Sequence, residues 1–274
     1  MPELPEVETI RLALKNGGRG AEPVVGRRIQ ESCLLWERTL AEPTPKKFQE
    51  RILGQEITDV DRRGKFLQLC LSGDTLIIHL RMSGDVNIIN QSEPVATHDR
   101  LWLGLDGELR LAFNDTRKFG RVWLVADPLS VTGNLGPEPL DNGFTSQEFH
   151  ARLHAHRRQL KPLLLDQTFI AGLGNIYTDE ALHLAQLHPL KISNTLNESQ
   201  SEHLWSSIRR VLQEGIERQG ASIDWVYRGG DFQNYFRVYQ RTGDPCPECG
   251  NPIQRITVGQ RGTHYCQYCQ AEPS

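Results

Sequence analysis

Four cysteines near the carboxyl end constrain the fold of their segment more than any other feature of the chain. Cys246-Pro-Glu-Cys249 is followed, after 16 residues, by Cys266-Gln-Tyr-Cys269. Two Cys-x-x-Cys pairs at this separation are typical of a tetrahedral zinc site. Because four thiolates leave no open coordination position, we expect one structural zinc ion. Disulfides are the alternative, and a reducing compartment disfavours them.

The residues between the two cysteine pairs predict a short hairpin. Residues 253–258 alternate in polarity as a strand does, Gly259–Gly262 has the composition of a turn, and residues 263–265 return as a second strand. This pattern predicts a zinc ribbon, in which the metal joins two strands. Arg261 lies at its tip, where a guanidinium can reach a phosphate group.

Length and charge set limits on the rest of the chain. The 274 residues suffice for two domains or one large one, with 38% hydrophobic and 24% charged residues. No apolar run is long enough to span a membrane, and the amino terminus lacks the pattern of a signal peptide, so we expect a cytoplasmic protein. The net charge is -3, so any nucleic-acid site must arise from local clustering of basic side chains.

Periodicity predicts an α+β multidomain protein. Residues 3–16 have the pattern of an amphipathic helix, and short alternating runs between turns over 26–126 predict an antiparallel β-sandwich. Helical periodicity follows at 147–166, 175–186 and 197–219, with Asn197 as a cap. The expected domains are a β-sandwich domain with its leading helix (1–130), a linker (131–146), a helical domain (147–235) and the zinc ribbon (236–274).

The chain begins Met1-Pro2-Glu3, which permits an unusual nucleophile. Removal of Met1 would leave Pro2 with a secondary amine, and an α-amino group has a pKa of roughly 7.7–8.0. Such an amine can add to a sugar aldehyde carbon and form an iminium, while Glu3 moves protons. Most Met-Pro starts carry no such chemistry, so this motif alone does not establish a function.

A glycine-rich turn between two predicted helices forms a second candidate site. Ile170-Ala-Gly-Leu-Gly174 precedes Asn175, which occupies the position of a helix cap. Backbone N–H groups at a helix start can bind a phosphate. A plain helical hairpin is the alternative.

Six segments in one order resemble the bacterial formamidopyrimidine-DNA glycosylase family, relatives of endonuclease VIII. The segments are Pro2-Glu-Leu-Pro-Glu6, Arg63-Gly-Lys65-Phe66, His79-Leu-Arg-Met82-Ser-Gly84, Asn114-Asp-Thr-Arg117-Lys-Phe119-Gly120, Leu173-Gly-Asn175-Ile-Tyr177 and the ribbon. The resemblance covers essentially the whole chain. It implies a base-excision repair enzyme that removes oxidised purines (formamidopyrimidines and 8-oxoguanine) from double-stranded DNA and then cleaves the abasic site by β,δ-elimination. It also implies a β-sandwich, a helix–two-turns–helix element and a zinc ribbon.

The resemblance further implies a role for particular residues. Pro2 corresponds to the nucleophile that attacks C1′, Glu3 to the proton donor and Glu6 to a supporting acid. Lys65 corresponds to a residue acting at the phosphate and in β-elimination, and Arg261 to the residue of δ-elimination. The implied DNA contacts are Asn175, Tyr239, His79, His98 and Arg157. Met82, Arg117 and Phe119 correspond to a wedge that fills the gap left by a flipped base; without the resemblance, Met82 and Phe119 would be expected in the core.

One departure concerns lesion preference. Residues 222–232 are about four residues shorter than the corresponding loop of the purine enzymes, and Trp225 or Tyr227 could stack on a flipped base or lie in the core. An enzyme for oxidised pyrimidines, of the endonuclease VIII type, is therefore the alternative. A zinc-ribbon DNA-binding protein without activity is a further one, which the Pro2-Glu3 pair, Lys65 and Arg261 argue against. We expect a monomer that acts on nucleoid DNA.

Overall fold

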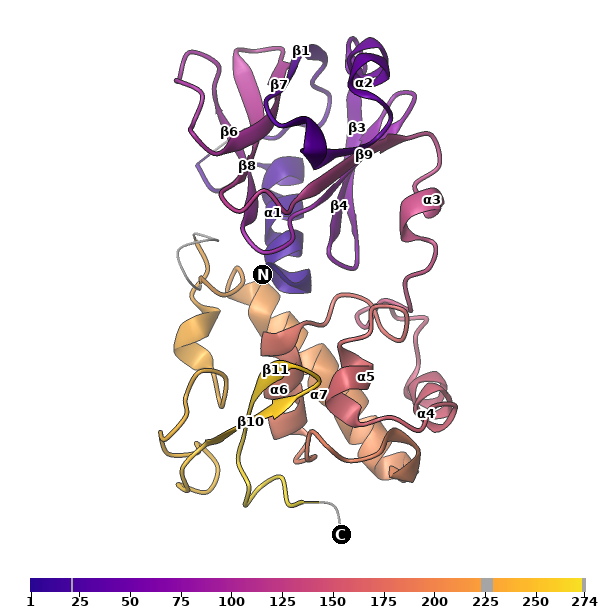
Figure 1. Ribbon diagram of the computed structural model, residues 1–274, viewed down its shortest axis with the longest axis vertical. Coiled ribbons are helices and arrows are strands. Elements are labelled where there is room, and N and C mark those ends of the chain that lie inside the picture. The colour runs from indigo at the N-terminus through magenta and orange to yellow at the C-terminus, as the bar shows by residue number, and fades with distance from the viewer. Residues whose placement is uncertain (21, 223–228, 273–274) are drawn as a thin grey trace. The chain divides into compact units, whose positions relative to one another are not determined.

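The computed structural model describes residues 1–20, 22–222 and 229–272, which form two compact units. The first unit comprises Met1–Asn134 and Gln219–Gly230, and the second comprises Leu135–Arg218 and Asp231–Ser274. Figure 1 shows both along the chain.

Two β-sheets and a leading helix build the first unit. The helix α1 (Leu4–Asn16) confirms the predicted amphipathic segment. The sheets have the strand orders β1-β7-β8-β6 and β2-β9-β5-β4-β3. The strands are β1 (Ile29–Leu34), β2 (Leu40–Glu42), β3 (Ile57–Arg63), β4 (Phe66–Leu71), β5 (Thr75–His79), β6 (Gly84–Asn90), β7 (Asp99–Leu105), β8 (Leu109–Asp115) and β9 (Arg121–Val125). Three short helices complete it: η1 (Glu37–Thr39), α2 (Pro45–Ile52) and α3 (Leu129–Thr132).

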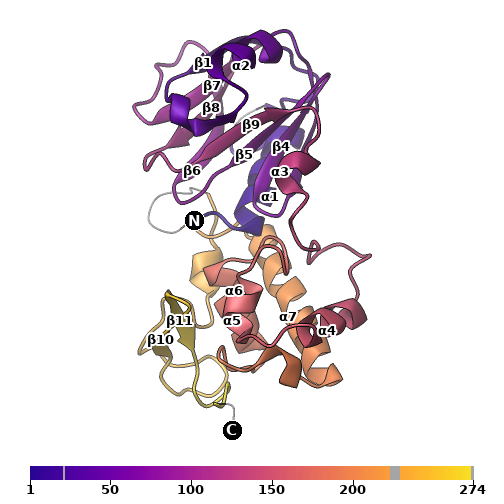
Figure 2. The same ribbon diagram turned by 45° about the vertical axis from the view of Figure 1, so that its right-hand side comes forward.

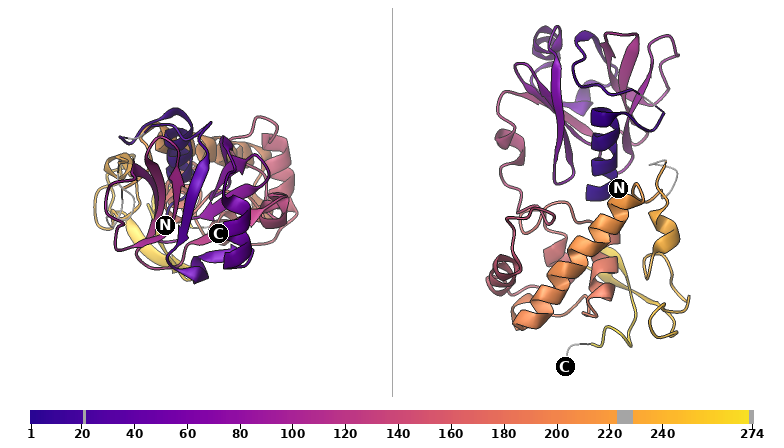
Figure 3. Two further views of the ribbon diagram at one scale, coloured as in Figure 1. Left: turned by 90° about the horizontal axis from the view of Figure 1, so that it is seen from above. Right: turned by 180° about the vertical axis from the view of Figure 1, so that it is seen from behind.

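The predicted sandwich is confirmed, and its pairings are antiparallel except where β2 runs parallel to β9 at one edge. Alternation along each strand directs one set of apolar side chains inward. These form one core with apolar residues of α1, such as Ile10 and Leu14. Because α1 packs against β3 and β4, its first turn is fixed relative to the end of the five-stranded sheet (Figure 3).

Helices form most of the second unit. They are α4 (Ser146–His154), α5 (Leu160–Leu164), α6 (Asn175–Leu184), η2 (Ser193–Thr195), α7 (Glu198–Glu217) and η3 (Phe232–Tyr235). Asn197 caps α7 as predicted, since its side chain accepts the N–H of Gln200.

The predicted continuous helix over 147–166 is wrong, because the chain breaks between α4 and α5. Pro162 would interrupt the hydrogen bonds of a continuous helix, but it is tolerated in the first turn of α5. The intervening segment pairs with a distant one instead: Leu160 N–H donates to Lys191 O at 2.8 Å, and Ser193 N–H donates to Arg158 O at 2.8 Å.

The predicted ribbon hairpin is present as β10 (Gln254–Val258) and β11 (Arg261–Tyr265). Its two turn residues, Gly259 and Gln260, both have positive φ, which matches the right-handed twist of a hairpin. The strand β11 packs against α6 (Figure 2). Among the helices of the described residues, none combines the length and apolar character needed to cross a membrane.

Candidate functional site

The start of α1 carries Pro2, Glu3 and Glu6, all buried. Glu3 is the N-cap in extended conformation, and Pro5 fits the first turn because its missing N–H would have no helical partner. The N–H of Glu3 donates to Glu6 Oε2 at 2.7 Å. This bond fixes the backbone that carries Pro2 and Glu3.

Glu6 also holds a segment that is distant in sequence. Its Oε1 accepts the N–H of Ala221 at 2.8 Å. Gly220 is required there, because it has φ +81° and a Cβ would lie 2.8 Å from Glu6 Cγ. With each carboxylate oxygen accepting a backbone N–H, Glu6 is placed to position the amino terminus.

Lys65 lies at the turn between β3 and β4, with its side chain buried. Arg62 Nε donates to Glu8 Oε2 at 3.0 Å, and Arg62 Nη1 donates to Gly64 O at 2.9 Å. Burial opposes ionisation of Glu8, but the hydrogen bond from Arg11 and the charge of Arg62 outweigh it and lower the pKa of Glu8. The pair of Glu8 and Arg62 therefore holds the Lys65 turn against α1.

His79 ends β5 and pairs with Phe66, the residue after Lys65. Burial, with smaller effects from Arg81 and Lys65, lowers the pKa of His79 to about 3. Its Nδ1 accepts the N–H of Arg81 at 3.0 Å, so the neutral ring carries its proton on Nε2. His79 is thus a neutral hydrogen-bond donor at neutral pH.

A buried carboxylate joins the two loops of the predicted wedge. Asp115 Oδ1 accepts the hydroxyl of Ser83, and Asp115 Oδ2 accepts the N–H of Gly120 at 2.7 Å. The Ser83 hydroxyl oxygen accepts the N–H of Arg117 at 3.0 Å. The loop after Met82 and the loop of Phe119 are thereby tied together.

The wedge side chains themselves differ in exposure. Phe119 is 51% exposed, which is unusual for a phenylalanine, and the Arg117 guanidinium lies 4.9 Å from its ring centroid. Met82 is half-buried. His98 lies next to the loop of Arg117 and Phe119, because its carbonyl accepts the N–H of Asp115 at 2.9 Å. The His98 side chain is exposed.

In the second unit, Asn175 contacts Gly262, the residue that follows Arg261. Asn175 is the first residue of α6, and the cap is Gly174, so the predicted cap position is one residue off. Asn175 Nδ2 donates to Gly262 O at 3.0 Å. Arg261 is exposed directly before Gly262, where it begins β11 rather than forming the turn.

Tyr239 lies beside the same strand. Its ring packs edge-on against His264, with centroids 5.1 Å apart. Its N–H donates to Glu180 Oε1 at 2.8 Å, and the same carboxylate accepts the N–H groups of Arg237 and Val238. Burial raises the pKa of Glu180, and these three donors oppose the rise.

Arg157 lies in the break between α4 and α5 and is exposed. The side chains on either side of it have partners within the protein: Arg158 Nη1 donates to Asp166 Oδ2 at 2.7 Å, and the His156 ring packs against Phe169. Of the three, Arg157 is the cation best placed to meet a ligand.

The four cysteines of the ribbon converge. Their Sγ atoms all lie within 4.8 Å of one another, with 3.9 Å between Cys246 and Cys269 and 3.4 Å between Cys249 and Cys266. Sulfurs around tetrahedral zinc at about 2.3 Å lie about 3.8 Å apart, so the cluster fits the ion. Among the described residues, the apolar cluster around the site contains Val238 and Ile253 besides cysteines, so a bound zinc ion would supply much of the local stability.

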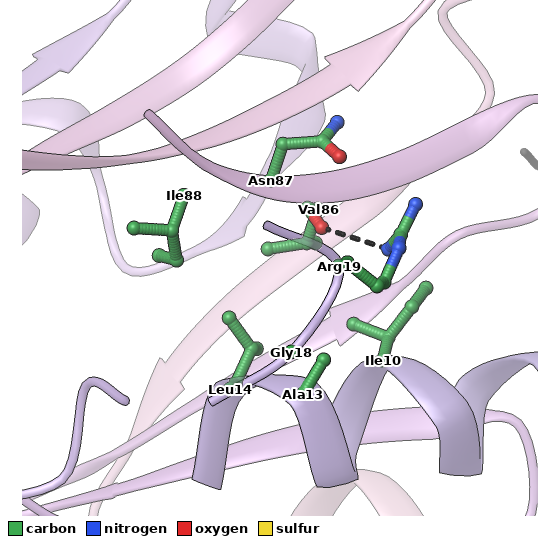
Figure 4. Close-up of a pocket in the computed structure, with 8 residues that line it drawn as sticks. All are labelled: Ile10, Ala13, Leu14, Gly18, Arg19, Val86, Asn87 and Ile88. Atoms are coloured by element: carbon green, nitrogen blue, oxygen red, sulfur yellow. Dashed lines mark hydrogen bonds between the residues drawn. The ribbon is translucent and has the colours of Figure 1, made fainter. Parts of the chain in front are cut away.

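Two cavities in the structure lie away from these residues. A pocket of about 30 Å³ between α1 and β6 has room for a water molecule and not for a nucleobase (Figure 4). Arg19 closes one side, where its Nη1 donates to Val86 O at 3.3 Å. A cavity of about 300 Å³ near His188 and Tyr265 also contains none of the predicted site residues.

Comparison with known proteins defines the class as DNA glycosylase. Residues 1–122 match the formamidopyrimidine-DNA glycosylase N-terminal domain, residues 135–226 match its H2TH domain, and residues 243–271 match the zinc finger found in FPG and IleRS. The matched domains include the sandwich, the helices and the four cysteines, whose cofactor is one structural zinc ion.

The chain belongs to the formamidopyrimidine-DNA glycosylase family. It is 42% identical to the formamidopyrimidine-DNA glycosylase of Protochlamydia amoebophila (98% of this chain, 99% of the relative) and 44% identical to that of Chloroflexus aurantiacus (98% of each). It resembles the Lactococcus lactis enzyme bound to DNA containing N7-benzyl-Fapy-dG, with a TM-score of 0.90 and 37% identity over 99% of this chain and 100% of that one. A MutM protein bound to DNA containing carbocyclic 8-oxo-G is 38% identical, with a TM-score of 0.90 and the same coverage.

Several residues that support these sites were not identified from the sequence. They are Glu8, Arg62, Ser83, Asp115, Lys161, Asp179, Glu180 and His183. Each is a polar residue that is buried or half-buried and contacts a residue distant in sequence, so no local pattern marks it. Trp225 and Tyr227, predicted to stack on a base or lie in the core, lie outside the described residues.

Proposed function

We propose that this DNA glycosylase excises oxidised purines and cleaves the resulting abasic site, with Pro2 as its covalent nucleophile. The observation that carries the proposal is the start of α1, where hydrogen bonding between Glu3 and Glu6 fixes the proline next to an acid. The relatives bound to DNA with Fapy-dG or 8-oxo-G support the purine substrate.

The amine of Pro2 attacks C1′ of the damaged nucleotide once Met1 has been removed. Glu3 donates a proton as the sugar ring opens, the base leaves, and an iminium joins the protein to the sugar. Loss of a C2′ proton then expels the 3′ phosphate, which is β-elimination. A second elimination expels the 5′ phosphate, and the amine is released on hydrolysis.

Lys65 and Arg261 serve the phosphate groups in these eliminations. Lys65 is placed by the pair of Glu8 and Arg62 in the unit that carries Pro2, and its ammonium stabilises a departing phosphate. Arg261 is exposed at the start of β11 and serves the δ-elimination.

The other site residues hold the DNA. Backbone phosphates are contacted by Asn175, Tyr239 and His79, and such contacts fix the position of the duplex without reading its sequence. Further contacts with the DNA come from His98 and Arg157. Met82, Arg117 and Phe119 fill the space left by the flipped base: two apolar side chains enter the stack and the guanidinium faces the unpaired base. We further infer that the protein acts as a monomer on DNA in the cytoplasm.

Borohydride trapping tests the proposal. Purified enzyme is mixed with duplexes carrying formamidopyrimidine, 8-oxoguanine, thymine glycol or an abasic site, and the adduct is mapped. We expect an adduct on Pro2 and faster single-turnover excision of the two purine lesions. An adduct on Lys65 together with a fully active Pro2→Gly variant would refute the nucleophile. Fastest excision of thymine glycol by a wide margin would instead support the pyrimidine enzyme.

A further inference from the structure

One row of side chains on α6 runs along the ribbon. Asn175, Asp179 and His183 are spaced four residues apart, so they project from one face of the helix. Asn175 Nδ2 donates to Gly262 O at 3.0 Å, Asp179 Oδ2 accepts the N–H of His264 at 2.9 Å, and His183 Nε2 lies 3.3 Å from Cys246 Sγ.

The spacing of this row matches that of the strand beside it. Four residues of α-helix advance about 6 Å, and two residues of a strand advance about 6.6–6.8 Å. The distance from Asn175 to Asp179 along the helix therefore matches the distance from Gly262 to His264 along the strand. Gly262 O and His264 N–H point to the same edge of β11, opposite the edge paired with β10. The third residue of the row, His183, contacts Cys246 of the cysteine cluster, and Cys266 of the same cluster directly follows β11.

The middle contact of the row is a buried ion pair. Lys161 Nζ lies 2.6 Å from Asp179 Oδ1 and 3.0 Å from Gly262 O, and the Lys161 and Asp179 side chains are fully buried. Asp179 Oδ2 faces His264. Because a buried charge is costly unless it is paired and hydrogen-bonded, this arrangement strongly favours one register of β11 on α6.

The last contact reaches the metal ligands. His183 is 1% exposed, and its ring nitrogen can donate to the thiolate of Cys246. A donor to a ligand atom orients that ligand and stabilises its charged form. The same helix that begins at Asn175 therefore also supports the zinc cluster.

We propose that the row of Asn175, Asp179 and His183 sets the register of the ribbon on α6, so that Arg261 is held next to Asn175. Asp179 and His183 are then positioning residues: Asp179 acts on the backbone that carries Arg261, and His183 acts on the cluster that closes the ribbon. The consequence for δ-elimination rests on the proposed function, whereas the consequence for zinc retention does not.

Zinc retention tests the His183 contact. The zinc-loaded protein is mixed with a chromogenic chelator, and the rate of metal transfer is measured. His183→Phe removes the donor but keeps an aromatic ring, and we expect about ten-fold faster transfer. His183→Gln, which keeps an N–H donor, should stay within about two-fold of wild type. The control is His150→Phe, which removes a bond to Ser201 on α7 and leaves the ribbon untouched. Equal rates for His183→Phe and wild type, or equal acceleration by both His183 variants, would overturn this role.

Product analysis tests the Asp179 contact. On a preformed abasic-site duplex, we expect Asp179→Asn to lower the ratio of δ- to β-elimination product at least five-fold, while the β-step stays within two-fold. The variant keeps an oxygen for His264 N–H and removes the charge that faces Lys161.

The control is Asp166→Asn, which breaks the more exposed ion pair with Arg158. If Asp179→Asn is folded by circular dichroism and gives the wild-type ratio, the register role is wrong. If Asp179→Asn is unfolded, the rates of zinc transfer from the His183 variants decide whether the row positions the ribbon. Absence of δ product from wild type would instead count against the proposed function.

Discussion

Glu6 accepts the backbone N–H of Glu3 at 2.7 Å, so a residue in the first turn of α1 holds the residue that caps the helix. The same carboxylate accepts the N–H of Ala221. Glu6 therefore connects the amino terminus to the segment that follows α7 in sequence, and its removal should affect both folding and chemistry.

Glu6→Gln should lower the free energy of unfolding by about 1–3 kcal/mol, because the amide nitrogen of glutamine would face a backbone N–H in a buried site. Iminium trapping should also slow. Urea unfolding and borohydride trapping measure the two effects. Glu148→Gln is the control, since Glu148 has the same position in α4 but is exposed, and glutamine serves there equally well. An equal loss of unfolding free energy in both variants would show that the buried contacts of Glu6 contribute no more to stability than the exposed ones of Glu148.

Retention of Met1 should abolish covalent trapping. With Met1 attached, the nitrogen of Pro2 is an amide and is not nucleophilic. Protein that retains the methionine, verified by mass spectrometry, should bind abasic DNA yet give no borohydride adduct. An adduct at wild-type yield would require another nucleophile.

Phe119→Ala should impair base excision with little effect on stability. Its side chain is 51% exposed, so the unfolding free energy should change by less than about 0.5 kcal/mol. Single-turnover excision from duplex DNA should fall at least ten-fold, since the gap in the stack is no longer filled. Leu129→Ala is the control, because Leu129 is 67% exposed on α3. Comparable loss in both variants would argue against the wedge.

DNA affinity should fall steeply with salt despite the net charge of -3, because cationic contacts release counterions. Arg157→Gln should reduce the slope of log K against log salt by about 1, because the loss of one cationic contact with DNA releases about one counterion fewer. Arg158→Gln should change it less, because Arg158 is paired with Asp166. Fluorescence anisotropy at several salt concentrations measures the slopes. A flat response for wild type would exclude a phosphate track.

Stability should fall with acid below pH 6.5 through His79. Burial lowers the pKa of His79 to about 3 in the folded protein, so between pH 6.5 and about 3 the unfolded chain binds the extra proton. Each pH unit in that window should cost up to about 1.4 kcal/mol. Unfolding free energies measured at several pH values should show a smaller slope for His79→Asn. An unchanged slope would mean that His79 is not the group responsible.

The sequence by itself determined the features whose chemistry is local. The spacing of Cys246, Cys249, Cys266 and Cys269 predicted the metal cluster, because each pair needs only a tight turn to present two sulfurs. Alternation from Phe66 to Leu71 predicted β4, since a strand with one buried face must alternate. The six segments that resemble the family also predicted membership, because each motif consists of only a few consecutive residues.

The tertiary structure decided which polar groups meet across long distances in the sequence. Asp115 and Ser83, or Asp179 and His264, have no sequence signal for their contacts, because a buried carboxylate and an exposed one look the same in a sequence. The break before α5 was also decided this way: residues 158–160 gain backbone partners at 191–193 in place of helical ones. Local periodicity is a property of one segment, whereas burial and pairing depend on what the rest of the chain places beside it.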